Sequence, residues 1–151
     1  MQTIWLFPIA EHIPQDRQEH LEAQLAVLLK EWAAHKKLMS SKASIEYSHF
    51  IVVQAFTDPS GCSIDWLQKE IRTLCDREGL TLLGNDAIFY EEADGTIRYV
   101  KLPALPQAIQ NGTLGPDTLV YDQTVLHQNT LEGWRKPLKE SWMARHLPQQ
   151  A

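Results

Sequence analysis

The chain is poor in cysteine: Cys62 and Cys75 are its two thiols among 151 residues. Two cysteines cannot form the disulfide framework that stabilises small secreted domains. A bridge between these two is also excluded, because Cys62 begins a predicted helix and Cys75 lies on the inner face of that same helix. Reduced thiols are typical of cytoplasmic proteins, so the sequence predicts a cytoplasmic location.

The chain also lacks an excess of basic charge and a long apolar run. Its 14 lysines and arginines are outnumbered by 19 aspartates and glutamates, which gives a net charge of -5. A nucleic-acid-binding surface needs clustered basic residues, so we expect no nucleic-acid partner. No apolar run approaches the ~20 residues that span a bilayer, and no basic residue precedes the apolar start at 4–7. We therefore expect neither a membrane partner nor a signal peptide.

Cofactor motifs are missing as well. The seven glycines are isolated and form neither the GxxxxGKS/T loop nor the GxGxxG loop that cradles phosphate groups. The nucleophile elbow of hydrolases, GxSxG, does not occur. The six histidines form no closely spaced ligand pair, and there is no CxxC sequence. The sequence therefore predicts no cofactor and no bound metal.

Apolar periodicity defines the elements that the chain does have. Apolar residues recur at helical spacing over 21–32 and again over 64–74. The predicted elements are a strand over 4–7, a helix over 14–37, strands over 45–47 and 50–56, a helix over 63–78, strands over 86–91 and 96–101 joined by an Asp-Gly turn, a short helix around 105–109 and a strand over 118–121.

The predicted order is β-α-β-β-α-β, followed by a further β-α-β segment and an irregular or weakly helical tail that contains tryptophan. The first six elements match the ferredoxin-like order, in which helices pack on one face of an antiparallel sheet. The sequence thus predicts an α+β fold, built as a single domain over residues 1–151. A sub-boundary near Gly84 is the alternative, with 85–147 as a smaller unit of hairpin, helix and strand.

The stretch Gly61-Cys62-Ser63-Ile64-Asp65 joins an apolar strand to the second helix and places a thiol, a hydroxyl and a carboxylate at a helix start. Free backbone N–H groups point outward there, and proteins often bind ligands at such positions. A purely structural interpretation also fits. Gly61 permits a tight turn, Ser63 caps the helix and Asp65 complements the helix dipole, while Cys62 is a small packed residue.

Cys62 also permits an enzymatic hypothesis. A thiol at a helix start can have a lowered pKa and act in acyl or thiol transfer, with His35 or His49 as the base. The negative charge of Asp65, one turn away, opposes a thiolate. The favoured hypothesis is a non-catalytic binding or adaptor protein with a small-molecule or peptide site near the Cys62 turn. Its predicted binding residues are Trp32, His35, Gly61, Cys62, Ser63, Asp65, Trp134 and Trp142.

Five tryptophans are many for this length, and Trp134 and Trp142 lie in a tail with little core of its own. Aromatic side chains with a polar group are frequent at binding surfaces, but large rings are more often buried. These two rings therefore either pack the tail onto the body or present a binding surface. A third hypothesis makes the tail a homodimer contact through Trp142.

A family resemblance covers nearly the whole chain. It is carried by WAAH at 32–35, SGCSID at 60–65, Asp117-Thr118 with Val120, Trp134, Pro137-Leu138, and Ser141-Trp142 with Arg145. In these segments the chain resembles an uncharacterised family of Bacteroidetes proteins of about 150 residues, and GCSID is the most specific element. Some members carry an automatic label as ABC transporter ATPases, which this sequence does not support because it has no phosphate-binding loop. Lys36 and Trp66 depart from the family pattern, which usually has glycine and lysine at these positions.

The last third of the chain is similar to GYF-like modules, which bind peptides through aromatic surfaces. The similarity rests on the spacing of Leu105, Ile109, Gly112, Thr118, Leu119, Val120 and Trp134. It implies an interaction role rather than catalysis for this part of the chain.

Overall fold

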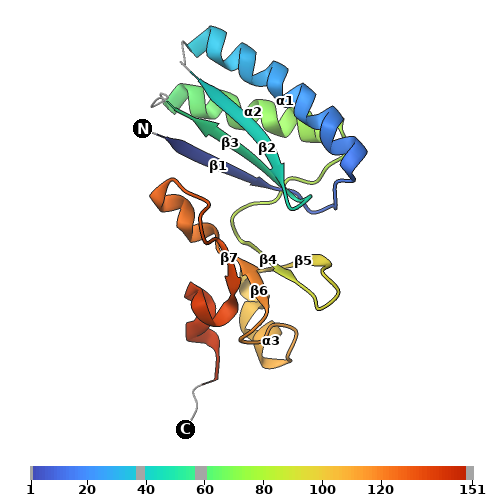
Figure 1. The fold of residues 1–151 in the computed structure, drawn as a ribbon, viewed down its shortest axis with the longest axis vertical. Coiled ribbons are helices and arrows are strands. Elements are labelled where there is room, and N and C mark those ends of the chain that lie inside the picture. Colours follow the sequence, from blue (N-terminus) through green and yellow to red (C-terminus); the bar gives the residue numbers. More distant parts are fainter. Residues whose placement is uncertain (1, 37–39, 57–60, 149–151) are drawn as a thin grey trace. The chain divides into compact units, whose positions relative to one another are not determined.

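The computed structural model describes residues 2–36, 40–56 and 61–148, and the chain divides into two compact units, 1–83 and 84–151. The predicted α+β class is confirmed, because both units combine helices with antiparallel strands (Figure 1). The first unit contains β1 (Thr3–Pro8), α1 (Gln15–Lys36), β2 (Ser41–Glu46), β3 (Phe50–Ala55) and α2 (Gly61–Arg77). The second contains β4 (Ala87–Glu91), β5 (Ile97–Lys101), α3 (Leu105–Gln110), β6 (Leu119–Tyr121) and β7 (Arg135–Pro137), with the short 3-10 helices η1 (Leu102–Ala104), η2 (Gln123–Gln128), η3 (Leu138–Glu140) and η4 (Trp142–His146).

The first unit is a three-stranded antiparallel sheet in the order β1-β3-β2, and α1 and α2 cover one of its faces (Figure 1). The nearly unbroken apolar run of β3 suits its central position. The predicted apolar stripes of both helices form one buried core with this strand: Leu21, Leu25, Leu28, Leu29, Trp32, Ile51, Val53, Leu67, Ile71 and Leu74. Burying each large side chain stabilises the fold by about 1.5–3 kcal/mol, so the stripes determine which helix faces meet the sheet.

The ferredoxin-like order is present, but its fourth strand does not join the first sheet. In that fold the strand after the second helix pairs beside the first strand. Here the described residues make a single bridge at that place, between Ile9 and Leu82, and the amide of Leu83 donates to the oxygen of Pro8 at 2.8 Å. β4 instead pairs with β5 and β6 in the second unit. The expected single sheet is therefore corrected to one sheet of three strands and one of four.

The second unit is an antiparallel sheet in the order β5-β4-β6-β7. The predicted hairpin is present: β4 and β5 pair around a turn in which Gly95 has a φ of 89° and the amide of Thr96 donates to Asp94 Oδ1. Glycine adopts such a positive φ without the strain that a side chain causes. Residues of the sheet, α3, the connection after α3, η3 and η4 share one core: Ile88, Tyr90, Leu105, Ala108, Ile109, Leu114, Val120, Leu138 and Met143.

The tail was expected to be irregular or weakly helical, and this is corrected in part because it contains a strand. β7 pairs with β6, with Val120 opposite Lys136, and the turns η3 and η4 follow. The sequence does not indicate this strand, because Arg-Lys-Pro has no apolar alternation and proline is depleted in strands. β2 also begins earlier than predicted, at Ser41 rather than Ile45.

Candidate functional site

Trp32 and Ser63, two of the predicted binding residues, meet in the first unit. The indole Nε1 of Trp32 donates a hydrogen bond to the backbone oxygen of Ser63 at 3.0 Å, and the ring of Trp5 lies edge-on to Trp32 with the centroids 5.8 Å apart. Trp32 is 0% and Ser63 2% exposed. The contact anchors the first turn of α2 to α1, and both side chains are too buried in this conformation to touch a ligand.

The remaining predicted residues at this turn are described only in part. Gly61 is the first residue of α2, and Asp65 is exposed on that helix. The side chains of His35 and Cys62 lie outside the described part of the structure, so their roles stay predictions. His49 precedes β3, whereas α2 begins after it, and a strand of 6 residues spans about 20 Å. β3 therefore separates His49 from the start of α2, and a role for His49 as the base of Cys62 stays a prediction.

Cys75 is buried on the inner face of α2, as predicted, and burial raises the pKa of its thiol to about 11, with Asp76 adding to the increase. At pH 7 roughly one molecule in ten thousand then carries a thiolate there. We expect iodoacetamide to leave Cys75 unmodified in the native protein and to alkylate it fully in concentrated urea, as measured by mass spectrometry of the peptide. Native alkylation at the rate of an unstructured cysteine would contradict this placement. Cys75 is also the internal control for measuring the reactivity of Cys62.

A polar corner around the buried His49 lies at the end of β1, and no sequence pattern predicts it. His49 is 4% exposed, and its Nδ1 lies 2.9 Å from the backbone oxygen of Ile9. Burial is the main cause that lowers the pKa of His49, and His12, with its ring edge-on at 5.8 Å, lowers it further. The carboxylate of Glu11 accepts from the amide and the hydroxyl of Thr81, each at 2.7 Å. These contacts join three separate segments of the unit, so the corner stabilises the fold.

A pocket in the second unit contains another predicted binding residue, Trp142. The pocket has a volume of about 150 Å³ and is lined by Asn85, Ile88, Tyr121, Gln123, Thr124, His127 and Trp142. Trp142 is half-buried, whereas Trp134 is 5% exposed and packs edge-on against Tyr121 with the centroids 5.1 Å apart. The two tail tryptophans therefore differ, because Trp134 is a packing residue and Trp142 borders an open volume.

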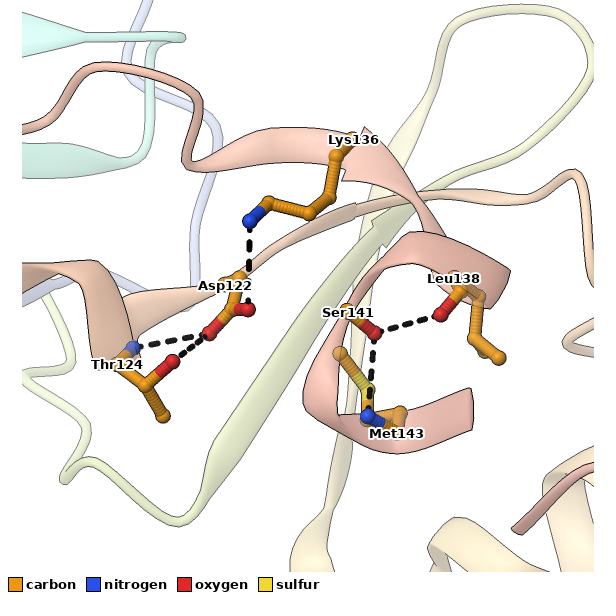
Figure 2. Close-up of polar contacts among 6 residues, drawn as sticks. All are labelled: Asp122, Thr124, Lys136, Leu138, Ser141 and Met143. Carbon is orange, nitrogen blue, oxygen red and sulfur yellow. Dashed lines mark hydrogen bonds and ion pairs between the residues drawn. The ribbon is translucent and has the colours of Figure 1, made fainter. Parts of the chain in front are cut away.

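Asp122 fixes the position of η2, which contributes Gln123, Thr124 and His127 to the pocket lining. Its Oδ1 accepts from the amide of Thr124 at 3.0 Å and from the Thr124 hydroxyl, and Lys136 Nζ lies 3.7 Å from its Oδ2 (Figure 2). The next residue, Gln123, donates from Nε2 to the backbone oxygen of Ala87 at 3.2 Å. Asp122 is buried, so water competes little for these bonds, and η2 is held against β4.

Ser141 fixes the turn that carries Trp142. Its hydroxyl donates to the backbone oxygen of Leu138 at 2.7 Å and accepts from the amide of Met143 at 3.2 Å (Figure 2). Ser141 is buried and acts as the N-cap of η4. A serine in this position satisfies an amide that the short helix leaves without a partner, and it sets the direction in which Trp142 leaves the backbone.

An ion-pair network lies beside Tyr121. Glu91 of β4 accepts two hydrogen bonds from Arg135 of β7, at 2.7 and 2.9 Å, and a third from the Tyr121 hydroxyl. The bonds from Arg135 are the main cause that lowers the pKa of Glu91. Burial and the neighbouring Glu91 carboxylate raise the pKa of Tyr121 well above its usual range. Tyr121 is therefore a neutral, fixed part of the pocket wall.

The pocket is built from side chains of the segments 85–88, 121–127 and 142. Sequence reasoning singled out Trp142 but missed Asn85, Gln123, Thr124 and His127, because polar residues in turns carry no signal that distinguishes a pocket from an ordinary loop. An indole wall with amide, hydroxyl and imidazole groups around it can bind an apolar side chain and form hydrogen bonds with the peptide groups next to it.

Among residues 2–36, 40–56 and 61–148, no cluster of three or more histidine, cysteine, aspartate or glutamate side chains is placed to hold a metal ion. No helix in the described part of the chain combines the length and the apolar composition that crossing a bilayer requires. The resemblances to the Bacteroidetes family and to GYF-like modules stay predictions. No family model, curated protein or solved structure matches the chain.

Proposed function

We propose that this is a non-catalytic binding protein and that the pocket beside Trp142 holds one apolar side chain of a peptide. The observation that carries the proposal is a half-buried tryptophan facing an open volume of about 150 Å³. Pockets for drug-sized ligands measure roughly 300–1,000 Å³, so this volume suits a single side chain better than a whole cofactor. A peptide supplies such a side chain on a backbone that continues along the protein surface.

The chemistry of the lining supports a peptide. Ile88 and Trp142 provide apolar surface, and Asn85, Gln123 and His127 provide hydrogen-bond donors and acceptors. An apolar side chain gains from burial against the indole, while the amide groups of the peptide backbone need polar partners when they leave water. A lining with both apolar and hydrogen-bonding groups can therefore bury the side chain and form hydrogen bonds with the peptide backbone beside it.

The indole of Trp142 is held in place before any ligand arrives. The guanidinium of Arg145 lies 5.5 Å from the centre of the ring, and the ring of His146 lies edge-on with the centroids 6.2 Å apart. Ser141 fixes the backbone from which the ring departs. Ordering a side chain during binding costs about 0.5–1.5 kcal/mol, so a ring that is already ordered favours tighter binding.

This proposal keeps the binding function predicted from the sequence, but it places the binding site beside Trp142 instead of at the Cys62 turn. Trp32 and Ser63 at the Cys62 turn are buried, whereas Trp142 borders a pocket. The similarity of the last third to GYF-like modules supports a peptide as the ligand. A reducing compartment such as the cytoplasm is supported by the low cysteine content and by Cys75, which is buried without a disulfide partner among the described residues.

The proposal is tested by selecting a phage-displayed library of random heptapeptides on the full chain and measuring the affinity of enriched peptides by fluorescence anisotropy. We expect the peptides to share one apolar residue. Trp142→Ala is expected to weaken binding at least tenfold, because truncating a central aromatic residue typically costs about 2 kcal/mol or more. Asn85→Arg places a large side chain in the pocket and is expected to weaken binding similarly.

The matched control is Gln128→Arg, which adds the same charge on η2 at an exposed residue that does not line the pocket. It should leave the affinity unchanged. Two results would overturn the proposal: a selection that enriches no peptide, or enriched peptides that bind Trp142→Ala and Asn85→Arg as tightly as the original chain. Sedimentation of the same samples shows whether a second copy covers Trp142, in which case the homodimer hypothesis replaces this one.

A further inference from the structure

Arg145 is unlike the other basic residues of the second unit. Five of the six lysines and arginines over 84–148 form ion pairs with carboxylates: Arg98 with Glu92, Lys101 with Asp86, Arg135 with Glu91, Lys136 with Asp122, and Lys139 with Asp117. In the described part of the chain, no carboxylate lies within ion-pairing distance of Arg145. Among the residues described over 84–148, Arg145 is therefore the one lysine or arginine without an ion-pair partner.

Arg145 also contacts a residue of the pocket lining. Its side chain is exposed, and its guanidinium lies over the ring of Trp142, which lines the pocket. A guanidinium stacked on an aromatic ring keeps the N–H groups along its edge available for hydrogen bonds in the plane. The stacking limits the positions that this edge can take, so the donors are held close to Trp142, a residue of the pocket lining.

No carboxylate lines the pocket among the described residues, so nothing in its wall offsets the charge of Arg145. The chain as a whole is acidic, with a net charge of -5, which makes an unpaired cation beside a pocket a local exception. Arginine remains charged across the physiological pH range and can donate two parallel hydrogen bonds to one carboxylate. Opposite charges at the rim of an interface select the partner more than they add affinity.

We infer that the pocket selects acidic peptides, in which a carboxylate next to the bound apolar residue pairs with Arg145. This inference rests on the proposed function, because Arg145 acts on a peptide whose apolar residue lies beside Trp142. Arg145 is the specificity-determining residue, and Trp142 and the pocket walls provide the apolar contact.

The test uses three pools of fluorescein-labelled heptapeptides. The central position varies among leucine, isoleucine, proline and phenylalanine, and its two neighbours are both glutamate, both glutamine or both lysine. We expect the glutamate pool to bind the full chain about three- to tenfold more tightly than the glutamine pool, with the lysine pool weakest. Raising the salt concentration should reduce this advantage, because the rim is solvated and its charges are screened.

Substitutions of Arg145 test whether this residue causes the preference for glutamate. Arg145→Gln should remove the glutamate advantage, so that the glutamate and glutamine pools bind alike, and Arg145→Glu should make the lysine pool the tightest. Arg98→Gln is the matched control, since it removes an exposed arginine of the same unit that is paired with Glu92. It should preserve the original ranking of the three pools.

The inference is overturned if the pools bind the original chain equally, or if Arg145→Gln keeps the glutamate advantage. Either result leaves the proposed function standing, provided that Trp142→Ala still weakens all pools. Failure of the proposed function looks different: no pool binds, or Trp142→Ala binds each pool as the original chain does.

Discussion

Replacing Trp32 with alanine is expected to lower the free energy of unfolding of residues 1–83 by about 3–5 kcal/mol. The ring is 0% exposed, lies edge-on to Trp5 and donates a hydrogen bond to the backbone of Ser63. The variant therefore loses a large buried apolar surface and the contact that joins α1 to the start of α2. Domains are stable by only about 5–15 kcal/mol, so this loss is a large fraction of the total. Urea unfolding, followed by amide hydrogen exchange in peptides from 1–83, measures the effect.

Two further variants separate the causes. Trp32→Phe keeps most of the apolar ring but lacks the N–H donor, and we expect it to cost about 1–2 kcal/mol. Trp66→Ala truncates a half-buried tryptophan that packs against the same core, and its cost should be clearly smaller than that of Trp32→Ala. Equal costs for Trp32→Ala and Trp66→Ala would show that Trp32 has no special role in anchoring α2.

Substituting Glu91 by glutamine is expected to lower the free energy of unfolding of residues 84–151 by about 1–2 kcal/mol at neutral pH. The charged carboxylate receives two bonds from Arg135 and one from Tyr121, and these bonds join β4, β6 and β7. A neutral amide accepts more weakly and leaves Arg135 without its counter-charge. Because the Arg135 side chain is 38% exposed, water screens part of the interaction, and the expected loss is smaller than for a fully buried pair. Amide exchange in peptides from 84–151 during urea unfolding measures it.

The pH dependence of this unit follows from the same carboxylate. The bonds from Arg135 hold the pKa of Glu91 below its ordinary value of 4.5. A carboxyl whose folded pKa is lowered contributes stability that is fully present above the ordinary value and is lost as the pH falls through the lowered one. Acidification below pH 4.5 should therefore destabilise the original unit more than Glu91→Gln. Glu92→Gln is the control, because it removes an exposed carboxylate paired with Arg98 and should change the acid profile little. Identical profiles for the original chain and Glu91→Gln would contradict the role given to Glu91.

Helices and the hairpin could be predicted from the sequence because their causes are local. The apolar stripe from Leu21 to Trp32 has the period of a helix wherever that helix packs, and a stripe of this width must be buried. The turn at Asp94 and Gly95 requires only the backbone freedom of glycine and a side chain that bonds its own turn. The burial of Cys75 follows from its position on the apolar face of α2. Each of these features depends on residues within about one element of each other.

The candidate site could be predicted only in part. Trp142 was identified because a tryptophan in a segment with few other apolar residues is conspicuous, but its role in a pocket depends on Ile88 and Gln123, which are more than fifteen residues away in sequence. The partner of the Trp32 indole, the backbone of Ser63, likewise has no signature, because any residue supplies a backbone oxygen. Long-range contacts of this kind leave no periodic trace in either of the segments that they join.

The sequence by itself therefore determined the α+β class, the order of the elements from β1 to β6 and the buried faces of the two long helices, because burial of periodic apolar residues is a local requirement. Only the tertiary structure decided that the chain after α2 makes a single bridge to the first unit's sheet region, between Leu82 and Ile9, while β4 pairs in the second sheet, that Arg135–Pro137 is a strand, and that Trp142 borders a pocket. These features depend on which strand edges and side chains meet across the fold. That choice is made by the sum of many weak contacts and not by any one segment.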